Sequence, residues 1–312
     1  MTFKSSKDMK IGIIGTGISV VGFLKNLKGD HDVKVFDKAF KLGGRLTMHR
    51  IDKYKLNLGA QYINPRSDEF KELILNAGCT PLQGSVVDVK SKEIVDASNF
   101  YVHEDGMNTI VKKYLKDFDV NMSTKVTGID LDKGILIFEN GNSELFDLII
   151  SSVPNQQLEQ LCEFNFSNEN VYSKCIALGA LVKDKNSFQF NCYKNLSKNI
   201  SWLALSSSFC TQSPLTLTAH LTPELSDELF SSSNDQIEKI AADDIVKTMD
   251  IKNESIEPLK LFKWRYALCQ RNNQGDGFIK LNKLIAIGDW ALGPRVESAY
   301  ESGRKAAVAL NT

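Results

Sequence analysis

The sequence lacks long apolar runs and an excess of either charge. No stretch approaches the roughly 20 apolar residues that a membrane-spanning helix needs. The short apolar run 11–14 is followed by glycines, which predicts a strand and not a signal peptide. The chain carries 38 Lys+Arg and 38 Asp+Glu, so it has no basic excess with which to displace the counterions of a nucleic acid. We therefore expect a cytoplasmic, globular protein with neither a membrane nor a nucleic acid as partner.

Cysteine and histidine are scarce and scattered. The six cysteines lie at least 13 positions apart and form no C-x-x-C pair, while the four histidines form no H-x-x-x-H pair. This pattern argues against structural zinc, other metal sites and thioredoxin-like chemistry. It also disfavours hydrolases, because no histidine accompanies a G-x-S-x-G elbow. We expect reduced and mostly buried thiols.

The first forty residues carry the strongest pattern. Residues 10–14 predict a strand buried on both faces, residues 18–28 predict a helix that ends at Gly29, and residues 33–37 predict a second strand. Such a β-α-β unit of about 30 residues predicts a parallel sheet with a right-handed crossover.

A glycine-rich turn joins the first strand to the first helix. Gly15 permits the tight turn, and Gly17 lets a pyrophosphate approach the positive end of the helix. Asp37, at the end of the second strand, is placed to accept hydrogen bonds from both ribose hydroxyls of an adenosine, and Lys38 could help neutralise phosphate. The fingerprint's third small residue is missing, since Val20 occupies that position. A glycine-rich turn in an unrelated α/β protein remains the alternative to dinucleotide binding.

Two later segments favour FAD over NAD. A second glycine pair ending at Gly44 follows soon after the ribose acid, and a longer dinucleotide needs such a pair for its second phosphate and ribityl chain. Arg45 offers a forked donor to a pyrophosphate or to the flavin edge. Near the other end of the chain, Gly288 and Asp289 follow a predicted strand, so this acid could bond ribityl hydroxyls. The helix that starts near Val296 could then stabilise negative charge on the reduced flavin.

The remaining pattern suggests a discontinuous architecture, because the last forty residues return to the style of the first forty. We predict helices over 69–77, 108–116, 234–249 and 296–310, and strands within 86–95, 129–140, 145–151, 176–182, 201–207, 215–220 and 284–287. The expected fold is α/β: a Rossmann-like, glutathione-reductase-like FAD-binding domain with an inserted β-rich substrate domain. The expected limits are 1–78, 106–155 and 276–312 for the FAD-binding domain, and 79–105 and 156–275 for the substrate domain.

These motifs together resemble the flavin-containing amine oxidase superfamily, and most closely its short bacterial renalase-like branch. The resemblance rests on Gly15-Thr-Gly-Ile-Ser, Phe36-Asp-Lys38, Gly43-Gly-Arg45, Leu58-Gly-Ala-Gln-Tyr62, Gly106-Met107, Lys263-Trp-x-Tyr-Ala267, Gly288-Asp-Trp290 and Arg295-Val-Glu297. It covers nearly the whole chain, closely over 10–65 and 284–310. The chain departs from the family pattern at Val20, at Asn57, where an acid is common, and at Lys263, where arginine is common.

The resemblance implies a noncovalent FAD whose adenine lies near Val126. The residues expected to bind the cofactor are Gly15, Gly17, Ile18, Asp37, Lys38, Gly44, Arg45, Gln61, Val126, Gly288, Asp289 and Val296. The residues expected to act on a small-molecule substrate are Tyr62, Trp264, Tyr266 and Arg295, of which the aromatic three would line the cavity. Arg295 would meet a phosphate or carboxamide of the substrate.

The renalase-like branch implies oxidation of dihydronicotinamide isomers, 2- and 6-dihydro-NAD(P), to NAD(P)+ with transfer of the electrons to O2 to give H2O2. The sequence is compatible with this reaction because loss of hydride makes an aromatic pyridinium, so no side chain needs to remove a proton. Two alternatives stay open. One is a flavin amine oxidase or another FAD-dependent oxidoreductase of a small substrate, and the other is a non-catalytic binding module with the same fold.

Overall fold

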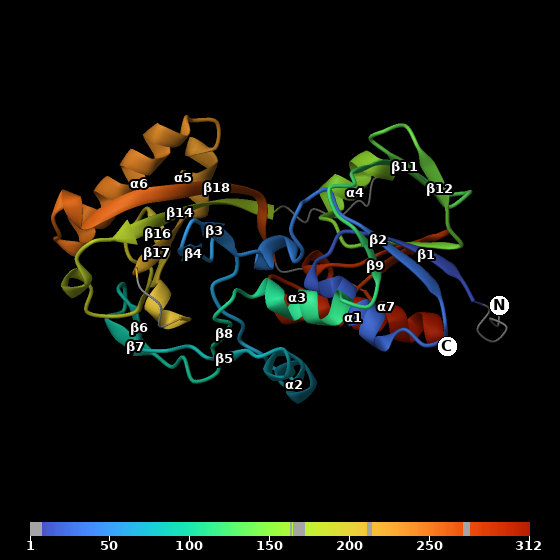
Figure 1. Cartoon of the computed structure of the whole chain (residues 1–312), viewed down its shortest axis with the longest axis horizontal. Coiled ribbons are helices and arrows are strands. Elements are labelled where there is room, and N and C mark those ends of the chain that lie inside the picture. The colour runs from blue at the N-terminus through green and yellow to red at the C-terminus, as the bar shows by residue number, and fades with distance from the viewer. Residues whose placement is uncertain (1–7, 163, 165–171, 211–213, 271–274) are drawn as a thin grey trace. The chain divides into compact units, whose positions relative to one another are not determined.

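The structure is a computed structural model that describes the chain except for residues 1–7, 163, 165–171, 211–213 and 271–274 (Figure 1). The chain divides into two compact units. Unit 1 consists of Met1–Gly44, Asn108–Val171 and Cys269–Thr312, and unit 2 consists of Arg45–Met107 and Tyr172–Leu268. Each unit is described by itself.

Unit 1 contains a six-stranded sheet in the order β19-β20-β13-β1-β2-β9. Its strands are β1 (Lys10–Ile14), β2 (Asp32–Phe36), β9 (Asp119–Asn121), β13 (Leu148–Ser151), β19 (Ile279–Leu281) and β20 (Leu284–Ala286). The neighbouring pairs are parallel except β19–β20, which is antiparallel. The first and last segments of the chain therefore contribute to one sheet, which confirms the predicted Rossmann-like fold.

The helices of unit 1 are α1 (Ile18–Asn26), α3 (Asn108–Leu115), α4 (Asn155–Cys162) and α7 (Val296–Asn311). The predicted end of the first helix at Gly29 is wrong. Leu27 is already extended, with ψ 130°, so the helix stops at Asn26, and the positive φ of Gly29, 102°, serves the turn that follows.

Two glycines bring α1 and α7 into backbone contact, and Figure 1 shows these helices side by side. A Cβ atom on Gly22 would lie 2.0 Å from the carbonyl oxygen of Tyr300, and a Cβ atom on Gly303 would lie 1.9 Å from the carbonyl oxygen of Ser19. Val20, which replaces the third fingerprint glycine, is completely buried. The small residues that permit this close helix packing thus lie at positions 22 and 303.

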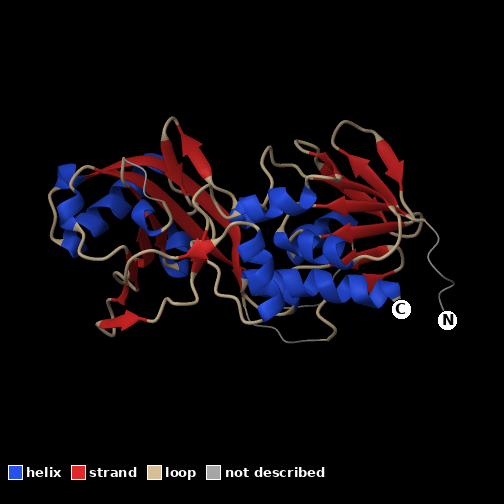
Figure 2. Ribbon diagram, turned by 60° about the horizontal axis from the view of Figure 1, so that its bottom comes forward, coloured by secondary structure: helices blue, strands red, loops and turns tan. Residues whose placement is uncertain are grey.

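A three-stranded antiparallel sheet completes unit 1. It consists of β10 (Val126–Asp130), β11 (Ile135–Phe138) and β12 (Ser143–Leu145). The ring of Phe138 lies 4.9 Å from that of Phe36 in β2, measured between centroids. We predicted strands within 129–140 and 145–151, and the structure divides the first of these into β10 and β11, with β12 paired to β11. Figure 2 shows the strands of the chain in red and its helices in blue.

Unit 2 is built on a seven-stranded sheet in the order β18-β14-β17-β16-β15-β6-β7. Its strands are β6 (Val86–Asp88), β7 (Glu93–Val95), β14 (Tyr172–Val182), β15 (Cys192–Lys194), β16 (Ile200–Leu205), β17 (Thr216–Leu221) and β18 (Ile256–Cys269). The unit also holds β3 (His49–Ile51) paired with β4 (Tyr54–Leu56), β5 (Thr80–Pro81) paired with β8 (Tyr101–Val102), and the helices α2 (Asp68–Asn76), α5 (Pro223–Leu229) and α6 (Asn234–Met249).

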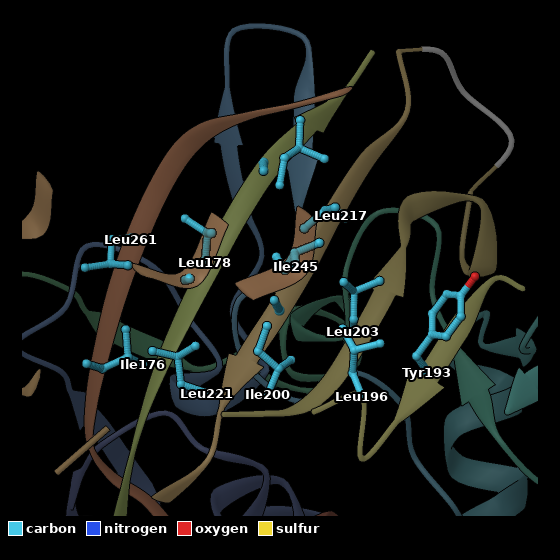
Figure 3. Close-up of a cluster of buried hydrophobic side chains, with 14 of the residues drawn as sticks. Ile176, Leu178, Tyr193, Leu196, Ile200, Leu203, Leu217, Leu221, Ile245 and Leu261 are labelled. Carbon is cyan, nitrogen blue, oxygen red and sulfur yellow. The ribbon is translucent and has the colours of Figure 1, made fainter. Parts of the chain in front are cut away.

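One face of the large sheet packs on α6. Leu178, Leu203 and Leu217 of three strands form a buried cluster with Ile245 of the helix (Figure 3). The predicted helix 234–249 is confirmed at both ends. Ser233 caps its start by accepting a hydrogen bond from the backbone N of Gln236 at 3.3 Å.

The longest strand, β18, has no counterpart among the predicted strands. Charged residues at Lys260, Lys263 and Arg265 interrupt its apolar pattern. Two of them contact the end of α5: Lys263 donates to the carbonyl of Phe230, and Arg265, which is exposed, lies over the Phe230 ring. These long charged side chains break the apolar alternation, and for this reason the strand was not predicted from the sequence.

The compact units differ from the expected domain limits at α4, whose residues 156–162 we assigned to the substrate domain and which belongs to unit 1. They also differ over residues 45–78, which we assigned to the FAD-binding domain. These residues pack within unit 2, because Leu56 and Leu58 form a buried cluster with Ala177 of β14.

All six cysteines are free thiols, and Cys79, Cys192, Cys210 and Cys269 are buried. Among the described residues, no helix is long and apolar enough to cross a membrane. The same part of the chain contains no group of three or more His, Cys, Asp or Glu side chains that could bind a metal ion.

Candidate functional site

The carboxyl ends of the parallel strands in unit 1 bring together residues that are far apart in the sequence. The backbone N of Gly15, after β1, donates to the carbonyl of Phe36 at 2.8 Å, beside Asp37. Ser152, after β13, donates its N to Ile14 at 2.9 Å, and Ile287, before Gly288, donates to Ser151 at 2.8 Å. The glycine turn and the ends of β2 and β20 thus share the sheet edge at which α/β proteins bind nucleotides.

The glycines at this edge serve two different purposes. Gly15 has φ 95°, and a Cβ atom on it would lie 2.4 Å from the hydroxyl oxygen of Ser152, so this glycine makes the turn and the close packing possible. A Cβ atom on Gly17 would meet nothing nearer than 3.9 Å, and one on Gly44 nothing within 4 Å. The space beside Gly17 and Gly44 is therefore open to the approach of a ligand, as a phosphate loop requires.

The carboxylate of Asp37 is held by three hydrogen bonds within unit 1. The Oδ2 atom accepts from the backbone N of Thr16 at 2.9 Å and from its hydroxyl at 2.6 Å. The Oδ1 atom accepts from the backbone N of Ala39 at 2.9 Å. We did not single out Thr16 from the sequence, because any residue can occupy the middle of G-x-G. The hydroxyl group of this residue was the available signal for its role, because the middle residue of a phosphate loop needs no hydroxyl.

The second glycine segment is anchored to α3. The Asn108 side chain donates from Nδ2 to the carbonyl of Leu42 at 3.2 Å, while its buried Oδ1 has no hydrogen-bond partner among the described residues. The backbone N of Gly43 donates to the Thr16 hydroxyl at 3.3 Å. Both glycine segments therefore meet at one hydroxyl group.

The other predicted residues of unit 1 lie at the ends of its elements. Ile18 is the first residue of α1 and is buried, Val126 is the first residue of β10 and is buried, and Lys38 is exposed. Their contacts with a cofactor stay a prediction.

At the C-terminal part of the edge, Gly288 is tied to α7. Its backbone N donates to the Ser302 hydroxyl at 2.9 Å, and this hydroxyl donates to the Gly277 carbonyl at 2.6 Å. Asp289 begins a short 3-10 turn and is 4% exposed. Ser302 is the second positioning residue that the sequence did not indicate.

The first turn of α7 has no side-chain cap. Arg295 is its N-cap residue and is exposed, and Val296 is its first helical residue. Uncapped backbone N–H groups at a helix start are suited to receive negative charge from a ligand.

Two of the predicted cofactor ligands, Arg45 and Gln61, lie in unit 2 and have partners inside it. Arg45 donates from Nη1 to the carbonyl of Ala267 at 2.9 Å, and its guanidinium lies 5.4 Å from the Tyr172 ring centroid. Gln61 donates from Nε2 to the carbonyls of Asn57 and Gly59. These contacts stabilise the turn that precedes Tyr62 and the end of β18.

An aromatic row extends along β18 on the sheet face opposite α6. Strand alternation puts Phe262, Trp264 and Tyr266 on one face, and the Phe262 and Trp264 rings lie 4.4 Å apart. The indole N of Trp264 donates to the carbonyl of Leu58 at 2.7 Å. Tyr266 contacts Tyr172 edge to face at 5.8 Å. Two of the predicted substrate residues therefore belong to one rigid strand.

Tyr62 belongs to a second aromatic group in the same unit. Its ring stacks on Phe100 at 3.9 Å with an interplanar angle of 7°, and it lies 5.2 Å from the ring of Trp202. Burial raises the pKa of the Tyr62 hydroxyl. Trp202 is paired across the strands with His220, which approaches Gln61 at 3.5 Å. The histidine and Trp202 were not among the predicted site residues.

Burial lowers the pKa of His220 to about 4. The imidazole is therefore neutral at pH 7 and a weak base. Lys263, another titratable residue near the aromatic row, points to the opposite face, where its ammonium donates to the carbonyls of Phe230 at 3.0 Å and Ser232 at 2.8 Å. This lysine holds the end of α5 in place.

The fold and the nucleotide edge of unit 1 are those of a dinucleotide-binding protein. Residues 13–75 match the NAD(P)-binding Rossmann-like domain, and residues 93–311 match the flavin-containing amine oxidoreductases. The chain belongs to the flavin-containing amine oxidoreductase family, and it is an FAD-dependent oxidoreductase.

Individual relatives agree with this assignment. Mouse (Mus musculus) renalase is 30% identical over 141 residues, which are 41% of this chain and 40% of that protein. The chain is thus matched to less than half the length of this curated relative. A redesigned putrescine oxidase shares the fold with a TM-score of 0.76 at 13% identity, over 97% of this chain and 99% of that one. A CLA-producing fatty acid isomerase from P. acnes has a TM-score of 0.75 at 10% identity, over 99% of this chain and 100% of that one. The match to renalase supports the resemblance drawn from the motifs.

The residues of unit 1 fit FAD. Gly17 and Gly44 border open space of the kind that two phosphates need, and the buried Oδ1 of Asn108, beside the second glycine segment, is an acceptor without a donor among the described residues. Asp37 and Asp289 would supply carboxylates for hydroxyl groups of the cofactor.

Proposed function

We propose that the chain is a renalase-like oxidase of dihydronicotinamides. It would oxidise 2- or 6-dihydro-NAD(P) with O2 and take up one proton, giving NAD(P)+ and H2O2. The match with renalase and the family membership support the proposal. The bound FAD supplies the hydride acceptor.

The observation that carries the proposal is the aromatic face of unit 2. Trp264 and Tyr266 present flat rings. Of the histidines in this unit, His220 approaches Gln61 and has its pKa lowered to about 4 by burial, and His49 lies against the Phe262 ring at 5.0 Å. Oxidation of a dihydropyridine needs ring orientation and no proton acceptor, since the product ring is aromatic. In this proposal Tyr62, Trp264 and Tyr266 orient the ring, while Arg295 meets the substrate's phosphate or carboxamide.

Anaerobic mixing with 6-dihydro-NAD is expected to bleach the absorption band of the oxidised flavin at about 450 nm in a single rapid phase. Air should then restore the band, with formation of H2O2. A band that persists with dihydronicotinamides but bleaches with amines would replace the proposal with a flavin amine oxidase. Protein that stays colourless after addition of FAD would support a non-catalytic module.

Trp264→Ala is expected to lower kcat/KM for the dihydronicotinamide about 100-fold, because the substrate's dihydropyridine ring loses the aromatic side chain that orients it. Trp264→Phe should retain more activity, since only the hydrogen bond to Leu58 is lost. The matched control is Arg265→Ala, which changes the next residue on the opposite face and should leave kcat/KM within about twofold. If Trp264→Ala and Arg265→Ala have equal kcat/KM values and similar melting temperatures, Trp264 does not orient the substrate.

A further inference from the structure

The Thr16 hydroxyl lies at the junction of three parts of the cofactor edge. It donates to Asp37 at 2.6 Å and accepts from the backbone N of Gly43 at 3.3 Å, and Thr16 is 1% exposed. Its single proton is therefore directed at the carboxylate, while its oxygen holds the second glycine segment. The hydrogen bonds from Gly43 to Thr16 and from Thr16 to Asp37 follow one another in the same direction, so each polarises the next.

This arrangement limits what Asp37 can offer a ribose. A carboxylate has about four acceptor positions. Two on Oδ2 are occupied by Thr16, through its backbone N and its hydroxyl, and one on Oδ1 is occupied by Ala39. About one acceptor position is left, on Oδ1. The sequence had suggested that this carboxylate accepts from both ribose hydroxyls, and the observed hydrogen bonds leave room for one.

We infer that Thr16 is a positioning residue that orients Asp37 to bind a single ribose hydroxyl of FAD, and that it couples this contact to the second glycine segment. The oriented carboxylate keeps one free position on Oδ1, at the sheet edge where β2 ends. The inference concerns the cofactor only and does not depend on the identity of the substrate.

The test measures the Kd of the apo form of the full chain for FAD and for its analogues that lack the 2′- or the 3′-hydroxyl of the adenosine ribose. Flavin fluorescence reports binding without turnover. One analogue should bind about 10- to 100-fold more weakly than FAD, as expected for the loss of a hydrogen bond to a charged group, and the other within about threefold. Equal losses for the two analogues would overturn the inference.

Substitution of Thr16 separates positioning from a purely structural role. Thr16→Val keeps the shape of the side chain but frees an acceptor position on Oδ2, so the difference between the two analogues should shrink while FAD itself binds about tenfold more weakly. Thr16→Ser should restore the wild-type pattern. In the Asp37→Asn background, Thr16→Val should add little further loss, because its effect passes through the carboxylate. An unchanged analogue preference in Thr16→Val, or full additivity with Asp37→Asn, would refute the role.

Discussion

Gly17→Ala is expected to give a folded protein that no longer holds FAD. The added methyl group would meet no protein atom nearer than 3.9 Å, and Gly17 has an ordinary φ of −72°, so the free chain can accept alanine. The same methyl group would occupy the space through which a phosphate approaches the backbone at the start of α1. We expect the Kd for FAD to rise about 100-fold or more, which corresponds to about 3 kcal/mol.

The measurement is a fluorescence titration of the apo-protein with FAD, combined with its melting temperature in the absence of FAD. The melting temperature should stay within about 2 °C of that of the unaltered apo-protein, because the position has no close neighbour. A variant that binds FAD as tightly as the unaltered chain would show that the phosphates do not approach Gly17.

Gly22→Ala is expected to destabilise the apo-protein strongly. In contrast to Gly17→Ala, its effect should not arise from the binding of FAD. In an open helix, alanine would be favoured over glycine by about 1 kcal/mol. Here its Cβ atom would lie 2.0 Å from the backbone oxygen of Tyr300, so α1 and α7 would have to move apart. We expect a net destabilisation of about 3 kcal/mol, or a fall of about 6–12 °C in the melting temperature of the apo-protein.

Gly17→Ala is the matched control, because it adds the same methyl group at a position where no protein atom lies nearer than 3.9 Å. Gly303→Ala should reproduce the loss from the other helix, since its Cβ atom would lie 1.9 Å from the oxygen of Ser19. If Gly22→Ala melts at or above the temperature of the unaltered chain, the close contact of α1 and α7 does not exist in solution.

Local patterns allowed much of unit 1 to be predicted. The apolar run of β1, the turn at Gly15 and the acid after β2 follow each other within one β-α-β unit, where backbone conformation and burial repeat over short distances. The helix 234–249 was predictable for the same reason, with Ser233 as its cap. The strand β18 was not, because charged side chains that contact the end of α5 interrupt its pattern.

The roles of individual side chains depended on contacts that sequence spacing does not reveal. Arg45 and Gln61 have donors suited to a cofactor, but the structure shows them bonded to carbonyls inside unit 2. Thr16 looked neutral in the motif and proved to bond Asp37, 21 residues away. Ser302 likewise meets Gly288 only because α7 packs beside the end of β20.

By itself the sequence determined the class of fold, the glycine turn and the acids that follow β2 and β20, because these depend on local periodicity and on backbone conformations that few residues allow. Only the tertiary structure decided which glycines face open space and which face another helix, and which acceptor positions of Asp37 remain free. The physical reason is that steric contact and hydrogen-bond saturation are properties of neighbours in space, and here those neighbours come from strands and helices far apart in the chain.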